Sequence, residues 1–397
     1  MKYKLEDLVD LQIGRTPPRK EFEWFNTNGE GYKWVSIKDM GNSGRFISDT
    51  SEYLTEAAQK RFGIPIVEKG TLLLSFKLTV GRLCITTDKM LTNEAIAQLP
   101  IKDSNIVDRD FLYYYLKNYN FHQLGSTSSI ATAINSTYLK KMEIDLPPID
   151  QQRAIAAVLS SIDDKIESNN AINNNLEQQA LALFESWFIN YEPWNCVCPN
   201  EWENGILGDY VDIKRGGSPR PIQDYLSDTG YRWLKISDAT AIASPFILSI
   251  KEHIKESGLS KTVLLHRGAL VLSNSATPGI PKILDIDSCI HDGWLYFPKS
   301  KFSNEYLYLF FKEIRSHLIS LGNGSVFTNL KTDILKNYPI RVPTDSILRD
   351  FDDMIKPLFR MILHCTRENQ HLCEVRDSLL PKFLSGAVDV SAISSID

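Results

Sequence analysis

The chain has 397 residues, of which 43% are hydrophobic and 23% are charged, which is the composition of an ordinary globular protein with room for two or three domains. No window approaches the length of apolar sequence that spans a membrane, and the first residues lack the apolar core of a signal peptide, so we expect a cytoplasmic protein. Six cysteines are scattered without a disulfide framework, and the spacing of Cys196 and Cys198 does not suit zinc, so we expect no bound metal.

The net charge of −5 is unevenly distributed along the chain. Residues 1–150 are neutral overall and residues 201–343 carry a net charge of +2, whereas 151–200 carry −4 and 344–397 carry −3. The negative charge is therefore concentrated in two segments, which leaves the other two free to form local basic surfaces. This distribution permits nucleic-acid binding but does not by itself indicate it.

The first segment of the chain returns in the second half, at an offset of about 200 residues. LEDLVDLQIGRTPP at 5–18 corresponds to LGDYVDIKRGGSPR at 207–220. Further pairs follow in the same order: YKWVSIKDM at 32–40 with YRWLKISDA at 231–239, EKGTLLLSF at 68–76 with HRGALVLSN at 266–274, FLYYYL at 111–116 with YLYLFF at 306–311, and LGSTSSIATAINSTYLKKMEIDLPP at 124–148 with LGNGSVFTNLKTDILKNYPIRVP at 321–343. The preserved order predicts an internal duplication.

Each copy has the same coarse plan. A strand leads into a glycine-containing turn, an aromatic strand and a further strand follow, and an apolar helix precedes a polar Gly/Ser/Thr loop. This order predicts mixed α/β (α+β) structure with a pseudo-two-fold repeat. We expect one globular domain at 1–148 and a second, similar domain at 193–343.

A long helix is expected after each domain, at 149–192 and within 344–397. Two interleaved series of apolar and amide residues repeat every seven positions in the first helix: Ile155, Ile162, Asn169, Leu176 and Leu183, and Leu159, Ile166, Asn173, Ala180 and Trp187. The second helix repeats the pattern, with Pro357 expected to kink it or to mark its true start. Such heptads predict a coiled-coil seam, so we expect two antiparallel helices that separate the domains.

The stretch SNNAINNN at 168–175 is unusual inside a helix, because asparagine competes with the helical backbone for hydrogen bonds. It is either a loop between two helices or a polar layer inside one. A buried asparagine in a seam lowers stability but selects one register. We interpret Asn169, Asn173 and Asn369 as register-setting residues, and we expect Asn173 and Asn369 to meet near the middle of the helix pair.

The sequence carries no familiar catalytic motif. A phosphate-binding loop, a nucleophile elbow and a zinc-protease helix are all missing from it. His291-Asp292 is a possible acid–base pair, but its counterpart Asn93-Glu94 cannot perform the same role. We therefore expect a positioning device and no catalysis by this chain.

Candidate nucleic-acid contacts lie in turns and polar loops that recur in both copies. Hydroxyl and amide groups on glycine-containing loops suit phosphate contacts, and Arg, Lys and Asn can read base edges. In the first copy they are Arg15, Thr16, Arg19, Lys38, Lys77, Ser126, Thr127 and Ser128. In the second copy they are Lys214, Arg215, Ser218, Arg220, Lys235, Asn274, Asn323 and Ser325. For each single residue the alternative is an ordinary solvated turn.

Over its full length the chain resembles the specificity subunit of a type I restriction-modification system. The segment LPPIDQQRAIAAVLSSIDDKI is similar to the boundary motif of that family, in which a Pro-Pro pair precedes an acidic-Gln pair and a long helix. Here Gln151-Gln152 replaces the acid with an amide. In the second copy Pro343 stands alone and no glutamine follows Thr344-Asp345-Ser346.

The resemblance implies that each domain reads one half of a bipartite double-stranded DNA target, and that the antiparallel helices fix the unread spacer. It also implies a bacterial complex with two DNA methyltransferase subunits and with restriction/translocase subunits. S-adenosylmethionine, ATP and Mg would then bind to these partners, and no cofactor to this chain. The alternatives are a coiled-coil adaptor that binds only proteins and a recognition module of another restriction-modification type.

Overall fold

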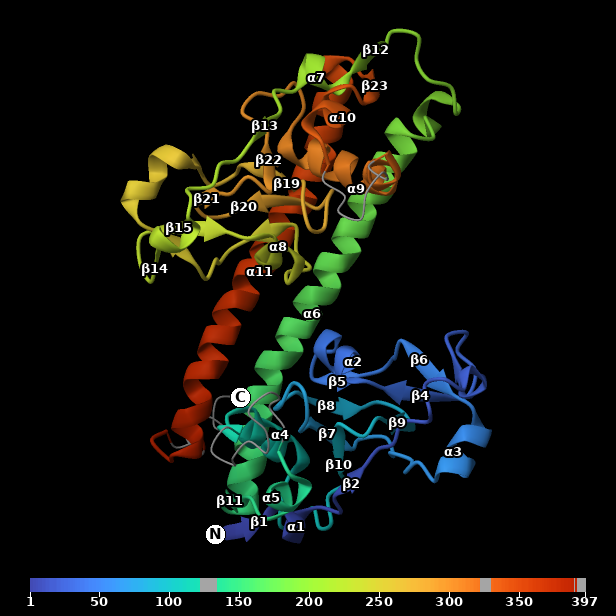
Figure 1. Cartoon of the computed structure of the whole chain (residues 1–397), viewed down its shortest axis with the longest axis vertical. Helices are drawn as coiled ribbons and strands as arrows, with labels where there is room; N and C mark the ends of the chain where they lie inside the picture. The colour runs from blue at the N-terminus through green and yellow to red at the C-terminus, as the bar shows by residue number, and fades with distance from the viewer. Residues whose placement is uncertain (122–133, 322–329, 389, 391–397) are drawn as a thin grey trace. The chain divides into compact units, whose positions relative to one another are not determined.

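The computed structural model describes residues 1–121, 134–321, 330–388 and 390. The chain packs into two compact units (Figure 1). Unit 1 comprises Met1–Glu167 and His371–Asp397, and unit 2 comprises Ser168–Gln370. Each unit therefore contains one copy of the repeat together with parts of both long helices.

Unit 1 is built around a five-stranded sheet of order β2-β10-β7-β8-β5 and a four-stranded sheet of order β3-β6-β4-β9. Its central strands β7 and β10 are buried at every position, which explains why their sequences are almost continuously apolar. The strands are β1 Lys2–Lys4, β2 Gln12–Ile13, β3 Phe25–Asn26, β4 Tyr32–Val35, β5 Phe46–Ile47, β6 Glu52–Leu54, β7 Leu72–Ser75, β8 Leu83–Thr86, β9 Met90–Thr92, β10 Ile96–Leu99 and β11 Glu143–Asp145. The helices are α1 Leu5–Leu8, α2 Ile37–Asn42, α3 Glu56–Phe62, α4 Arg109–Lys117 and α5 Ser136–Lys140.

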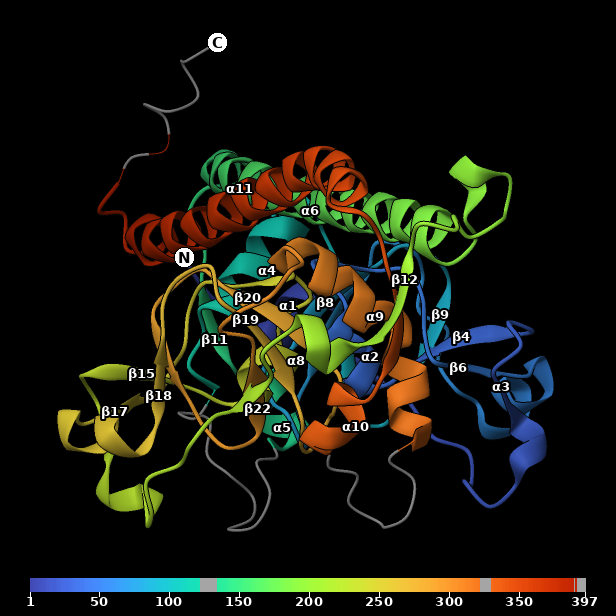
Figure 2. The ribbon, with the colours of Figure 1, turned by 90° about the horizontal axis from the view of Figure 1, so that it is seen from above.

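Unit 2 repeats this plan with sheets of order β13-β22-β19-β20-β16 and β14-β17-β15-β21-β18. The apolar helix α9 packs on the first of these sheets at β20 (Figure 2). The strands are β12 Glu203–Ile206, β13 Lys214–Arg215, β14 Leu226–Ser227, β15 Tyr231–Leu234, β16 Phe246–Ile247, β17 His253–Ile254, β18 Val263–Leu265, β19 Leu270–Ser273, β20 Pro281–Leu284, β21 Ser288–Ile290, β22 Trp294–Tyr296 and β23 Pro339–Val342. The helices are α7 Leu207–Tyr210, α8 Ile236–Thr240, α9 Asn304–Leu321 and α10 Thr332–Lys336.

The duplication is confirmed, and equivalent residues of the two copies even share unusual backbone conformations. The turn after β7 places Leu78 in the left-handed region with φ 65°, and the turn after β19 does the same to Ala276 with φ 57°. Three residues later, Gly81 and Gly279 also have positive φ, at 92° and 79°. The two mixed α/β copies therefore share one architecture, as their sequence order predicted.

Two helices of 40 residues each follow the copies, α6 Ile149–Phe188 and α11 Asp345–Leu384. Helix α6 is unbroken through SNNAINNN, so the loop alternative is wrong. Helix α11 begins at Asp345 and continues through Pro357, so the proline does not mark its start. Within unit 2 the helices run antiparallel, because Phe188 packs on Phe351 with ring centroids 4.7 Å apart, while Asn169 bonds to Asn369 near the other end of this segment.

The asparagines of the helix pair make different contacts from those predicted. Asn169 is fully buried, and its Nδ2 donates to Asn369 Oδ1 at 2.9 Å and to Glu368 Oε2 at 2.7 Å. Asn173 donates to Thr366 Oγ1 instead, at 3.2 Å. The predicted meeting of Asn173 with Asn369 is therefore wrong, because the antiparallel register places the residue one turn earlier, Asn169, opposite Asn369.

The start of α6 is tied to unit 1 by one buried side chain, Gln152. Its Oε1 accepts from the backbone N–H of Asp108 at 3.0 Å, and its Nε2 donates to the carbonyls of Ile106 and Pro147. The second copy lacks this glutamine and uses another contact: Ser303 Oγ donates to Asp352 Oδ1 at 2.6 Å. In the second copy the long helix is thus tied to its domain about two turns after its start at Asp345.

A buried ionic network also joins both helices to the domain within unit 1. Arg376 of α11 lies 2.6 Å from Asp163 of α6, with side-chain exposures of 12% and 6%. Tyr114 of α4 donates to the other oxygen of Asp163 at 2.8 Å and receives a bond from Arg45 at 3.3 Å. Hydrogen bonding and charge from Asp163 and Asp377 outweigh burial and raise the pKa of Arg376. This arrangement keeps the arginine charged inside the unit.

Membrane-spanning helices and clusters of metal ligands are both absent from the described residues. None of the described helices is long and apolar enough to cross a membrane. In the same part of the chain, no three His, Cys, Asp or Glu side chains group together as metal ligands do.

Candidate nucleic-acid interface

The glycine turns after β2 and β13 occupy equivalent places in the two units. The N–H of Gly14 bonds to the carbonyl of Ile96, and the N–H of Gly216 bonds to the carbonyl of Trp294. A Cβ at Gly14 would clash with the Thr92 carbonyl, and one at Gly216 would clash with the His291 carbonyl. Glycine therefore lets each turn lie directly against the turn that follows β9 or β21.

In unit 2 four of the predicted contact residues converge on Asp292, which lies in the turn after β21. The hydroxyl of Ser218 donates to Oδ1 at 2.7 Å, and Arg220 Nη2 lies 3.1 Å from Oδ2. Arg215 Nε donates to the Asp292 carbonyl at 2.5 Å, and Asn274 Nδ2 approaches the same oxygen at 3.4 Å. The hydrogen bond from Ser218 is the main cause that lowers the pKa of the Asp292 carboxyl below its usual range, with Arg215 and Arg220 adding to it, so this side chain is an anion at neutral pH.

An open groove of about 790 Å³ lies beside this cluster. Its polar lining includes Ser218, Arg220, Lys235 and His291. Lys235 pairs with Glu252. Burial lowers the pKa of His291, and its Nδ1 accepts from the N–H of Gly293 at 2.8 Å, so the ring is neutral and carries its proton on Nε2. The groove thus offers cations, hydroxyls and one imidazole N–H next to a carboxylate.

Unit 1 repeats the central contact of this cluster with different side chains. The hydroxyl of Thr16 donates to Glu94 Oε2, in the turn after β9. Arg15 Nη1 donates to the Phe62 carbonyl at 2.8 Å. Thr16 and Ser218 are therefore equivalent in structure, and so are the carboxylates of Glu94 and Asp292.

Arg19 has a specific environment of its own in unit 1. It forms two hydrogen bonds with Glu52, at 2.7 and 3.0 Å. Its guanidinium lies 4.6 Å from the ring centroids of both Phe25 and Trp34. This stacking fixes the side chain in one place while 52% of it stays exposed.

The remaining predicted contact residues do not join either cluster. Lys38 is exposed on α2, Lys77 lies over the ring of Phe76 at 5.2 Å, and Lys214 is exposed on β13. Five others lie outside the described residues: Ser126, Thr127, Ser128, Asn323 and Ser325. The first described residue after each of these segments makes an equivalent contact: the N–H of Ile134 bonds to the carbonyl of Phe76, and that of Leu330 to the carbonyl of Asn274.

Sequence reasoning missed the two acidic residues at the centre of the clusters. In the sequence, Asn93-Glu94 and His291-Asp292 look like two unlike residue pairs, because only the second can act as an acid–base pair. Their shared backbone geometry was the better signal: the N–H of Ala95 bonds to the Asn93 side chain just as that of Gly293 bonds to His291.

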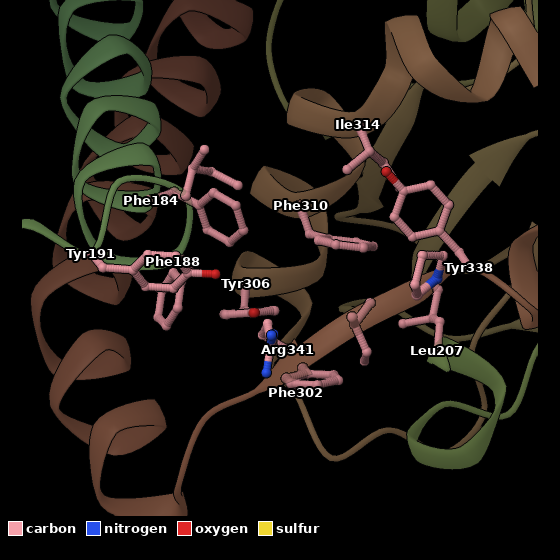
Figure 3. A pocket seen from close by; sticks show the side chains of 13 residues that line it. Phe184, Phe188, Tyr191, Leu207, Phe302, Tyr306, Phe310, Ile314, Tyr338 and Arg341 are labelled. Atoms are coloured by element: carbon pink, nitrogen blue, oxygen red, sulfur yellow. The ribbon is translucent and has the colours of Figure 1, made fainter. Parts of the chain in front are cut away.

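A second hollow of about 210 Å³ lies at the end of α6 within unit 2 (Figure 3). Phe184 and Phe188 reach it from α6, and Phe302, Tyr306 and Phe310 approach from α9 and the segment before it. Among the described residues that line it, Arg341 is the only charged one. This hollow is part of the aromatic core that joins α6 to unit 2, and its lining lacks the charges of the groove beside Asp292.

Comparison with known proteins gives one consistent result. The family model described as "Type I restriction modification DNA specificity domain" matches residues 1–178 and again 199–363. The chain belongs to this family. Each copy of the repeat is therefore one type I DNA specificity domain.

The relatives and solved structures agree with the family. The chain is 26% identical to the type I restriction enzyme MjaIX specificity subunit of Methanocaldococcus jannaschii, over 98% of this chain and 94% of that one. It is 22% identical to the HindI specificity subunit of Haemophilus influenzae, over 72% of this chain and 79% of that one. The crystal structure of a type I S subunit from M. genitalium has the same fold, with a TM-score of 0.57 at 16% identity over 96% of this chain and 95% of that one.

Proposed function

We propose that this chain is the DNA-reading subunit of a type I restriction-modification complex, in which each specificity domain reads one half of a bipartite target. The observation that carries this proposal is the repeated cluster at the glycine turn, built on one backbone plan with different side chains in the two units. Equivalent positions suit the same task on two half-sites. Different side chains suit two different base sequences.

The long helices α6 and α11 supply the spacer in this proposal. Their antiparallel contacts within each unit, at Asp163 with Arg376 and at Asn169 with Asn369, support a fixed register. The length of DNA between the half-sites would then follow from the length of the helices. A protein-only adaptor would not require the groove beside Asp292, whose lining combines Arg220, Lys235 and serine hydroxyls.

The chemistry of the complex belongs, in this proposal, to other subunits. Two DNA methyltransferase subunits would bring S-adenosylmethionine, and restriction/translocase subunits would bring ATP and Mg. This chain would supply target choice and assembly. The absence of a familiar catalytic motif from its sequence is consistent with that division.

A domain exchange tests the proposal. Residues 1–148 are replaced by the corresponding domain of another family member, while both long helices are kept so that the cores of the units remain complete. Methylation sites mapped in cells that carry the complex should change in one half of the target and keep the other half and the spacer. The matched control exchanges residues 199–343 and should change the opposite half. A change in both halves after either exchange would contradict the two-reader proposal.

A further inference from the structure

The carboxylates of Glu94 and Asp292 stand where a DNA-binding surface would ordinarily avoid negative charge. Both lie in the turn between equivalent strands, β9 and β10 in unit 1 and β21 and β22 in unit 2. Both accept a hydrogen bond from the hydroxyl of the glycine turn, Thr16 or Ser218. The acid is therefore a shared feature of two domains whose surrounding side chains differ.

Both carboxylates remain accessible to a ligand. Glu94 is exposed, and the side chain of Asp292 is 39% exposed even with Arg220 beside it. The hydroxyl bond uses one oxygen of each acid, and Arg220 contacts the other oxygen of Asp292, but a carboxylate has about four acceptor sites. Each side chain thus keeps acceptor capacity toward the outside.

The chemistry of DNA limits what such an acceptor can contact. A phosphate oxygen repels a carboxylate and offers no hydrogen. In the major groove the donors are the exocyclic amino groups of adenine and cytosine. Arg215 and Arg220 beside Asp292 in unit 2, and Arg15 next to Thr16 in unit 1, would offset the repulsion from the backbone.

We propose that Glu94 and Asp292 are specificity-determining residues that each accept a hydrogen bond from the amino group of one adenine or cytosine, one in each half-site. This inference rests on the proposed function. It adds that one base position of each half-site must present an amino group to this turn. The hydroxyls of Thr16 and Ser218 act as positioning groups that hold the acid in place.

The experiment removes single amino groups from DNA. The full chain, assembled with its modification subunits, first selects its target from a random-sequence duplex library. Each adenine of the target is then replaced in turn by purine, and each cytosine by 2-pyrimidinone, and affinities are measured at fixed salt. The wild-type complex should lose affinity roughly tenfold at one such position in each half-site.

The variants assign that loss to a residue. The Asp292→Ala complex should bind equally well with and without the amino group at one position of one half-site, and should still lose affinity when the amino group is removed in the other half-site. The Glu94→Ala complex should show the reverse. Asp287→Ala is the matched control, because Asp287 is an exposed acid of unit 2 that pairs with His266, and it should respond as wild type.

Two results would overturn the inference. If Asp292→Ala and Glu94→Ala keep the wild-type response to every amino deletion, the acids only brace the glycine turns, and the two-reader proposal still stands. If the wild-type complex selects no sequence from the library, the proposed function fails and the inference fails with it.

Discussion

Arg376 and Asp163 form an ion pair that is almost completely buried inside unit 1. Replacing Arg376 with Met should lower the free energy of unfolding by about 3–5 kcal/mol, because Asp163 would keep a buried charge without its cation. Denaturant unfolding of the full chain measures this change. The exposed pair of Lys60 with Glu56 gives the control, and Lys60→Met should cost no more than about 0.5 kcal/mol.

The double variant Asp163→Leu/Arg376→Leu separates loss of the pair from loss of packing. It removes both charges together, so it should recover most of the stability that the single variant loses. If Arg376→Met lowers the free energy of unfolding no more than Lys60→Met does, the ion pair does not hold α11 to unit 1.

Single residues also show how far sequence reasoning reached at the site. Arg215, Ser218, Arg220 and Asn274 were predicted from composition and repeat position, and the structure brings these four together. Asp292 was missed because a carboxylate does not suggest DNA binding when residue types are considered one at a time. Only the fold shows that these side chains share one acid, since Arg215, Ser218 and Arg220 precede Asp292 by 72 to 77 residues in the sequence.

At the scale of the helices, the asparagine layer can be tested by its effect on register. Asn169 Oδ1 is buried and has no hydrogen-bond partner among the described residues, so its burial lowers stability. Replacing Asn169 and Asn369 together with Leu should therefore raise the free energy of unfolding, by about 1 kcal/mol or more. The same change should loosen the register and broaden the set of accepted spacers.

The range of accepted spacers is measured as the affinity for a series of duplexes whose spacer lengths differ in steps of one base pair. Asn174→Leu is the control, because Asn174 is exposed on α6, and it should keep a single preferred spacer. An unchanged preference in the double variant would mean that Asn169 and Asn369 do not set the register.

The two long helices could be predicted from the sequence, whereas the contacts between them could not. Heptad spacing predicted both long helices, because the repeat of apolar residues is a local property of the chain. The partner of Asn369 depended on the relative register of two segments about 200 residues apart, which local patterns do not encode. Pro357 likewise proved compatible with a continuous α11.

At the scale of the whole molecule, the duplication was the most reliable guide. Matching segments in a preserved order predicted two copies of one α/β plan, and equivalent strand orders and left-handed residues confirm it. The sequence did not reveal that each unit takes parts of both long helices. That composition depends on packing: Leu380 and Phe383 of α11 belong to the core of unit 1, and Phe184 and Phe188 of α6 belong to that of unit 2.

Because the core of each unit includes side chains from both long helices, two fragments of the chain should complete each other's cores. A cut between residues 198 and 199 would leave the helical segment that completes unit 2 on the first fragment and the one that completes unit 1 on the second. Fragments 1–198 and 199–397, expressed together, should therefore reassemble into a heterodimer that copurifies and unfolds as the intact chain does. The variant Phe184→Asp/Phe188→Asp in the first fragment should abolish that reassembly, whereas Ile172→Asp, at an exposed position of the same helix, should not. Independent folding of both fragments without association would contradict the shared cores.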